Sequence, residues 1–169
     1  MANFTSTGAD TYPAGHVIQI VGTNGYANQS FDADHDVIIE IGISGVLASS
    51  KCAIFISATV NINHNSGEGF EGNIYRKATT MGAAGTEVSG ATKINSTAGS
   101  GNDDAAIFTY FERGSDAFNM YAQASFYCLD ESPPTGTMYY AMSGSGYATQ
   151  SPSIAHDGNK TIIVMEYTA

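Results

Sequence analysis

Alternating aspartates in the sequence, Asp32, Asp34 and Asp36, are the pattern that most resembles a metal site. Oxygens at positions one, three and five of a loop can converge on one calcium ion. An EF-hand loop also needs glycine at position six and a bidentate glutamate at position twelve, where this chain has Val37 and Ile43. The expected structure is therefore a solvated turn before a strand, and these aspartates remain candidates only for a calcium site of another geometry.

Other residue types that could do chemistry are scattered along the chain. No histidine has a second histidine or a cysteine at the spacing of metal ligands. Several carboxylate pairs could in principle serve a glycosidase, but an acidic chain produces such pairs by chance. No nucleophile elbow, phosphate loop or dinucleotide fingerprint occurs in the sequence. We therefore expect no enzyme, no catalytic residues and no cofactor.

The two cysteines, Cys52 and Cys128, lie in apolar segments. Two cysteines make no disulfide framework, and thiols stay reduced in a cytoplasm. We expect two buried free thiols that act as small core residues.

The charge balance excludes several partners. Six Lys and Arg against sixteen Asp and Glu give a formal net charge of -10. Nucleic-acid binding depends on a basic footprint, which this chain lacks. No apolar run approaches the ~20 residues of a spanning helix, and the first residues do not resemble a secretory signal. We expect no nucleic-acid partner, no membrane insertion and synthesis in a cytoplasm.

Strand patterns run through most of the chain. From Cys52 to Ile62 apolar residues alternate with polar ones, which indicates a strand with one buried face, and Phe55 is the exception on the polar side. The last ten residues, Lys160 to Ala169, also predict a strand paired inside a sheet. Other expected strands are 16–22, 37–44, 69–77, 105–113, 117–129 and 137–143. Glycine-rich turns separate them.

This spacing predicts an all-β protein, an antiparallel β-sandwich or jelly roll, with one domain over 13–169. Residues 1–12 are polar and lack alternation, so they are expected to form an N-terminal attachment arm that includes Asn3, Phe4 and Tyr12. The segment 81–104 is rich in Gly, Ala, Ser and Thr. It is expected to be one long loop, or two weak edge strands, projecting from the domain.

Aromatic residues crowd the last sixty positions of the chain. Tyrosine combines an apolar ring with a polar hydroxyl and suits half-buried interfaces. Neighbours such as Tyr139 and Tyr140 must point to opposite faces of a strand, so the sheets are expected to carry apolar groups on both sides. Association of the subunits, as a homotrimer, is the simplest way to cover the second face. The interface candidates are Tyr110, Tyr121, Tyr139 and Tyr147.

Six segments in a fixed order resemble a domain common in tailed bacteriophages. They are Pro13–Ile20, Ser49–Ala58, Asn73–Lys77, Leu129–Pro134, Met138–Tyr140 and Thr161–Tyr167. That domain recurs at the tips of tail-fibre proteins and in small virion surface proteins. The resemblance implies an antiparallel jelly roll that associates as a trimer, and it supplies no catalytic residues. A fibre protein would carry a long shaft before this domain, whereas here only 1–12 precede it.

The short arm favours a homotrimeric capsid decoration protein on the virion surface, assembled in the host cytoplasm and bound to the major capsid protein. Two alternatives remain open. One is a tail-fibre tip, a receptor-binding protein joined to a tail component, whose loops contact a host surface glycan or protein. The other is a calcium-dependent lectin, which depends on the three aspartates alone.

Overall fold

The computed structural model describes residues 14–25, 29–30, 35–64, 70–94, 118–146, 153–154 and 159–168. Within these ranges the regular secondary structure consists of β-strands. The strands are β1 (Val17–Gly25), β2 (Gln29–Ser30), β3 (Asp36–Val46), β4 (Ser50–His64), β5 (Phe70–Lys77), β6 (Thr92–Lys93), β7 (Phe118–Asp130), β8 (Gly136–Gly146), β9 (Ser153–Ile154) and β10 (Lys160–Thr168). The predicted all-β fold is confirmed, and the expected strand at 105–113 lies outside the described residues.

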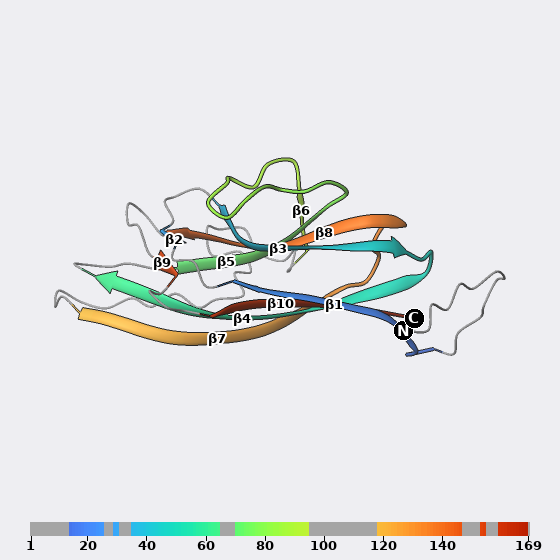
Figure 1. Cartoon of the computed structure of the whole chain (residues 1–169), viewed down its shortest axis with the longest axis horizontal. Helices are drawn as coiled ribbons and strands as arrows, with labels where there is room; N and C mark the ends of the chain where they lie inside the picture. The colour runs from blue at the N-terminus through green and yellow to red at the C-terminus, as the bar shows by residue number, and fades with distance from the viewer. Residues whose placement is uncertain are drawn as a thin grey trace, which may run out of the picture.

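Two antiparallel sheets lie face to face as a sandwich (Figure 1). Sheet A has the order β1-β10-β4 with β7 on the other side of β4, and the short β9 and β2 extend it. Sheet B has the order β3-β8-β5-β6. The long strands pair as β1 with β10, β3 with β8 and β4 with β7, and β5 pairs with β8 on one side and with the short β6 on the other. The nested pairs among these correspond to one long antiparallel hairpin rolled into two layers, which is the arrangement of a jelly roll.

The alternation that predicted β4 fixes its orientation in the sandwich. Cys52, Ile54 and Ile56 are buried between the sheets, whereas Phe55 is exposed on the outer side of sheet A. Among the buried residues between the sheets, Tyr140 from β8 is one of the largest. Burial of these apolar side chains supplies the main stabilising free energy of the fold.

The last strand is an inner strand of sheet A, as predicted. β10 pairs with β1 on one side and with β4 on the other. The C-terminal end of β10 forms hydrogen bonds with the first described residues. The Gly15 N–H donates to the Thr168 carbonyl oxygen at 2.9 Å, and the Thr168 N–H donates to the His16 carbonyl oxygen at 3.0 Å. Residues 15 and 168 are therefore neighbours at one end of sheet A.

A buried carboxylate holds the turn between β3 and β4 against β10. Glu166 is fully buried and accepts hydrogen bonds from the Leu47 N–H at 2.7 Å, the Ser50 hydroxyl at 2.6 Å and the Gln19 side-chain amide at 2.6 Å. Ser49 in this turn has a φ of 69°, a left-handed conformation that is uncommon outside glycine. The carboxylate supplies the acceptors that this turn requires.

A second polar cluster joins the two sheets. The Arg76 guanidinium of β5 donates to both carboxylate oxygens of Asp130 at 2.6 and 2.5 Å, and the Tyr140 hydroxyl donates to the same carboxylate at 2.8 Å. Because Asp130 is buried, this paired geometry compensates for the loss of hydration of its charge.

The chain itself covers the outer face of sheet B. After β5, Met81 and Val88 pack on Val37 and Ala141 of that face, and the segment leading to β6 arches over the sheet (Figure 1). Glu40 anchors it by accepting hydrogen bonds from the Thr80 hydroxyl and the Met81 N–H. The prediction that this segment projects from the domain was therefore wrong for 81–94, because its isolated apolar residues cover the face of sheet B. The alternative of weak edge strands is confirmed in part, since β6 is a two-residue strand at the edge of sheet B. Residues 95–104 lie outside the described part.

Candidate interaction face

Sheet A differs from sheet B because its outer face displays large apolar side chains. Ile20 of β1 is 61% exposed, Phe55 of β4 is 42% exposed and Tyr127 of β7 is 67% exposed. Val17, Leu129 and Ile163 are exposed as well. We call this surface the sheet A face. It comprises the outward residues Val17, Ile20, Ala53, Phe55, Ser57, Ser125, Tyr127, Leu129, Thr161, Ile163, Met165 and Tyr167.

Strand register places these residues side by side. Phe55 lies opposite Ile163 on β10 and opposite Tyr127 on β7. Residues that face each other across an antiparallel pair point to the same side of the sheet. Ile20 likewise lies opposite Met165, so the apolar surface continues from β7 across β4 and β10 to β1.

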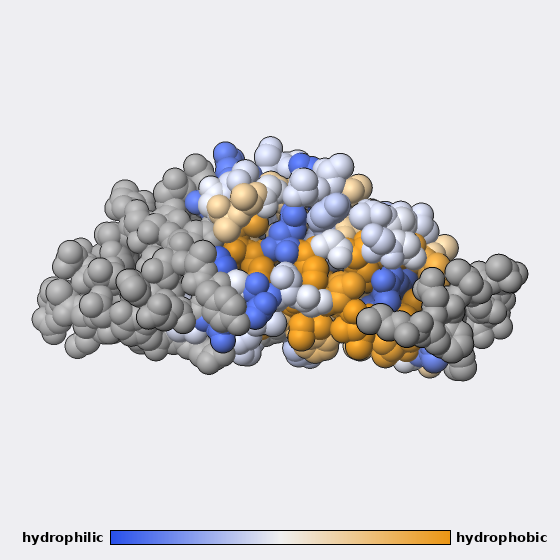
Figure 2. All heavy atoms as spheres, in the orientation of Figure 1, coloured by the Kyte–Doolittle hydropathy of each residue, from blue (hydrophilic) through white to orange (hydrophobic). Residues whose placement is uncertain are grey.

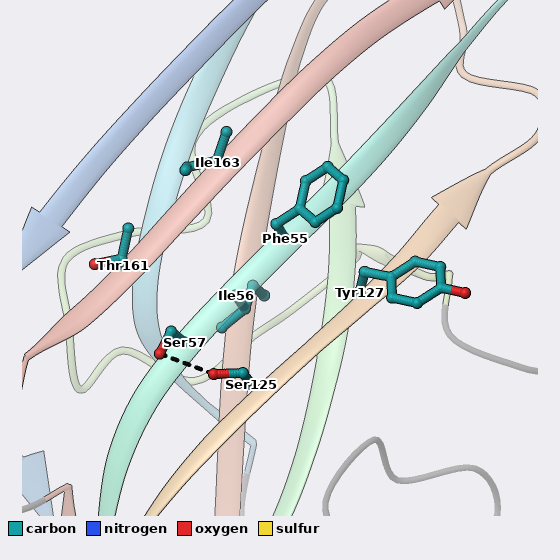
Figure 3. A pocket seen from close by; sticks show the side chains of 7 residues that line it. All are labelled: Phe55, Ile56, Ser57, Ser125, Tyr127, Thr161 and Ile163. Atoms are coloured by element: carbon teal, nitrogen blue, oxygen red, sulfur yellow. Dashed lines mark hydrogen bonds between the residues drawn. The ribbon is translucent and has the colours of Figure 1, made fainter.

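The rings of Phe55 and Tyr127 form a ridge on this face, with centroids 6.2 Å apart and planes at 30°. Figure 3 shows Phe55 between Ile163 and Tyr127, whereas Ile56 points to the other side of β4. One hollow of about 370 Å³ adjoins the ridge, and Ser57, Ser125 and Thr161 contribute hydroxyl groups to its lining.

A second hollow of about 320 Å³ also adjoins the ridge. Its lining includes Val17, Leu129, Met165 and Tyr167. Both hollows are open and mainly apolar, so the face consists of a protruding aromatic ridge with shallow depressions beside it. This relief suits a protein surface better than a small polar ligand.

The sheet A face is almost free of charge. Among its described residues there is no aspartate or glutamate, although the whole chain has sixteen. At the margin, Lys51 forms an ion pair with Glu131, and this hydrogen-bonded carboxylate raises the pKa of Lys51. Near the other end of the ridge the Ser125 hydroxyl donates to the Ser57 hydroxyl at 3.1 Å. The face therefore has an apolar centre with polar groups around it, as protein interfaces do.

Figure 2 shows how polarity divides the molecule. Hydrophobic atoms reach the surface at the lower right of the view, over the region where β1 and β10 run in Figure 1. The described residues of the upper layer are mainly polar in the same view. The view is edge-on to the two sheets, and the sheet A face lies on the underside of the lower layer. Exposed apolar patches such as the sheet A face mark interaction sites in soluble proteins.

Of the residues that the sequence put forward as interface candidates, Tyr139 is the one whose side chain the structure describes, and it does not lie on this face. Tyr139 lies half-buried on the outer side of sheet B, packed against the second core cluster. Tyr121 belongs to β7 and pairs with Asn61 of β4. The other tyrosine candidates, Tyr110 and Tyr147, and the arm residues Asn3, Phe4 and Tyr12 lie outside the described residues.

The calcium candidates are only partly described. Asp36 begins β3 and forms an isolated backbone bridge with Glu87, whereas Asp32 and Asp34 lie outside the described ranges. Within those ranges no three His, Cys, Asp or Glu side chains come together as metal ligands would. The calcium hypothesis stays a prediction.

Among the described side chains, His35 and Ser143 approach each other in the way that a catalytic pair would. The His35 ring nitrogen lies 3.5 Å from the Ser143 hydroxyl and 3.5 Å from the Asn73 amide. Ser143 is fully buried, so its oxygen does not face a space where a substrate could sit. We interpret these contacts as packing at the end of sheet B.

Among the residues that the structure describes, there is no helix long and apolar enough to span a bilayer.

Sequence reasoning noticed Phe55 as an exception but did not select Tyr127, Ile163 or Ile20 for the interface. A usable signal was present in two uninterrupted apolar runs, 126–129 and 162–165. Such runs, in place of alternation, are typical of strands that are covered on both faces. They predict an apolar outer surface for β7 and β10.

Comparisons with known proteins give no family. No family model and no curated protein matches the chain. Among solved structures, a protein of infectious bursal disease virus, Gx strain, is 13% identical over 97% of this chain and 36% of its own, with a TM-score of 0.39. A protein of the T13 particle of the same virus is 12% identical over 98% of this chain and 40% of its own, with a TM-score of 0.38.

The chain thus spans less than half the length of these viral proteins. At TM-scores below 0.5 these likenesses do not establish a shared fold, and no function follows from them.

Proposed function

We propose that this protein is a non-catalytic structural component of a bacteriophage virion, a homotrimeric decoration protein displayed on the capsid surface. The observation that supports a binding role is the sheet A face, an apolar surface spanning four strands of an otherwise acidic molecule. Surfaces of this kind are stabilised when another protein covers them.

The assignment to a virion is supported by the order of the six sequence segments that resemble small virion surface proteins. The jelly-roll topology agrees with what that resemblance implies. In this proposal the domain 13–169 is the outward body, and the arm 1–12 contacts the major capsid protein. Many copies, each with modest contacts, are retained together on one particle through multivalency.

The copy number per particle tests this proposal. We expect quantitative mass spectrometry of purified particles to give hundreds of copies of the chain relative to the major capsid protein. A few dozen copies or fewer, found with tail proteins after particles are separated into heads and tails, would identify a tail-fibre tip. Absence from purified particles would contradict both readings.

A further inference from the structure

We propose that the sheet A face is the surface through which copies of this chain associate, so that the partner covering the Phe55–Tyr127 ridge is the same face of a second copy. This inference rests on the proposed function in one respect, because it assigns a surface to the homotrimer proposed there. It does not require that the protein belong to a virion.

Charge identifies a second copy as the partner that fits best. Each chain has a net charge of -10, so two copies repel each other wherever acidic parts of their surfaces come together. The sheet A face lacks carboxylates among its described residues, and its marginal lysine is already paired with Glu131. Two such faces can meet without placing like charges together.

A basic or acidic partner protein would fit this face less well. The face offers no carboxylate for a basic partner to pair with, and Lys51 alone would meet an acidic one. Charged groups of such a partner would lose hydration without gaining a counter-charge. The chemistry of the face therefore calls for another apolar, uncharged surface, which a second copy provides.

The relief of the face also fits association with itself. Each copy has a projecting ridge, Phe55 and Tyr127, and shallow hollows beside it. Contacts in a cyclic trimer are heterologous, so the ridge of one copy can enter the hollows on the sheet A face of the next copy. Exposed tyrosine and phenylalanine at the centre of a patch are typical of residues that dominate the free energy of association.

The dimensions are sufficient for the centre of an interface. Four strands about 4.8 Å apart, followed over about six residues that rise about 3.4 Å each, cover roughly 400 Å². A standard interface buries about 800 Å² on each partner, of which the centre is apolar and the remainder is a polar rim. The hydroxyl groups of Ser57, Ser125 and Thr161 lie where such a rim would be.

Sedimentation equilibrium of the purified full-length chain tests the inference without any virus particle. We expect a mass of three times 17.7 kDa for the natural chain. Tyr127→Glu should weaken association by about 30-fold or more, because it removes a central aromatic ring and places one negative charge per copy in the interface. Raising the sodium chloride concentration should strengthen association of the natural chain, since no interfacial ion pair is lost and general repulsion is screened.

The control variant is Ala84→Glu, which adds the same charge at an exposed position over sheet B and should leave the mass unchanged. Circular dichroism and thermal unfolding should show that Tyr127→Glu keeps its fold, since Tyr127 is largely exposed. A second folded variant, Ile163→Lys, should also dissociate the oligomer.

Three results would overturn the inference. The first is a natural chain that is monomeric at micromolar concentration. The second is an oligomer that persists in both folded variants, Tyr127→Glu and Ile163→Lys, with particle binding unchanged. The third is an oligomer that persists in both variants while their binding to particles is lost, which would assign the face to the capsid. That last result would leave the proposed virion function standing, whereas an intact oligomer absent from all particles would reject the virion function alone.

Discussion

Glu166 shows how one side chain connects separate parts of this fold. Its carboxylate is fully buried, and the three donors that reach it come from β1, from the turn before β4 and from the first residue of β4. All three donors are neutral groups. Hydrogen bonds to a charged acceptor are stronger than neutral ones, and a buried donor left without an acceptor is costly.

We therefore expect Glu166→Ala to lower the free energy of unfolding by about 3 kcal/mol. Glu166→Gln keeps an acceptor oxygen for Leu47 and Ser50 and should lower it by about 1 kcal/mol. Urea unfolding followed by circular dichroism measures both changes. Glu131→Gln, at an exposed ion pair, is the control and should have almost no effect. Equal loss in Glu166→Ala and in the control would contradict the role of Glu166.

The two thiols lead to a prediction about reactivity. Burial raises the pKa of Cys52 to about 11 and that of Cys128 to about 12. The thiolate is the reactive form, so alkylation of the folded protein at pH 8 should be roughly 100-fold or more slower than alkylation of the unfolded chain. Timed labelling with iodoacetamide, with and without urea, measures this ratio. Rapid labelling of the native protein would show that the thiols are accessible.

The same pKa values give a direction for stability against pH. In the unfolded chain the thiols titrate near pH 8.5, whereas in the folded chain they keep their protons to about pH 11. The unfolded state therefore binds fewer protons in this window, and the free energy of unfolding falls as pH rises through it. The lowered pKa of Lys160 acts in the opposite direction. A Cys52→Ala/Cys128→Ala variant, compared at pH 7.5 and pH 10, should show a smaller fall than the natural chain.

At this scale the sequence identified some residues and missed others. Both cysteines are free thiols, as predicted, and Cys52 is buried because it lies on the inward side of an alternating strand. The prediction that Cys128 is buried was wrong in degree, since Cys128 is half-buried on β7, which among the described strands pairs only with β4. The roles of Glu166 and Asp130 were not predictable. Their partners lie on strands far away in the chain, and nothing in the local pattern distinguishes a buried carboxylate from an exposed one.

Among the elements, the segment between β5 and β6 distinguishes the two outer faces of the sandwich. The Val88 N–H donates to the His35 carbonyl oxygen at 2.8 Å, and the Gly85 N–H donates to the Val37 carbonyl oxygen at 2.8 Å. These bonds and the Glu40 carboxylate hold the segment on sheet B. Few apolar side chains assist them, so the segment should open more readily than the core.

We expect Glu40→Ala to speed hydrogen exchange of the Gly85 and Val88 amides by about tenfold while amides of β4 and β10 keep their protection. The reason is that the variant removes the acceptor for Thr80 and Met81 where the segment begins. Glu87→Gln, an exposed change within the segment, should leave exchange unaltered. Uniform acceleration throughout the protein would mean that the segment unfolds only with the whole domain.

Most strands could be predicted from local patterns, but their pairing could not. Alternation and β-branched residues located β1, β3, β4, β5, β7, β8 and β10 within a few residues. Pairing of β1 with β10 joins residues that are 135 to 150 positions apart, from Gly25↔Lys160 to Val17↔Tyr167. This pairing depends on which faces remain to be buried after all the strands have formed. The apolar runs in β7 and β10 indicate that these strands have apolar outer sides, but the joining of those sides with β1 and β4 into one surface depends on the strand pairing.

For the whole molecule, the N-terminal arm can be tested by truncation. A chain beginning at Pro13 keeps β1 and the hydrogen bonds between residues 15, 16 and 168, so its melting temperature should change by less than about 3 °C. It should keep the oligomeric mass of the full chain but bind less tightly to particles that lack the protein. Differential scanning calorimetry, sedimentation and co-pelleting with particles measure these three properties.

Unfolding of the truncated chain would mean that the arm is part of the domain. Undiminished binding to particles would place attachment elsewhere on the molecule.

The neighbouring positions of residues 15 and 168 also determine how the molecule responds to mechanical force. β1 and β10 are antiparallel, and the ends at which the chain enters and leaves them lie together. A pull applied between these ends loads the hydrogen bonds of the pair one after another, as a zipper is opened, and not all at once. The domain should therefore yield at low force when it is held by both ends in an optical trap. A tether at one end alone leaves the β1–β10 seam unloaded, so single-ended attachment is the mechanically durable way to anchor this domain.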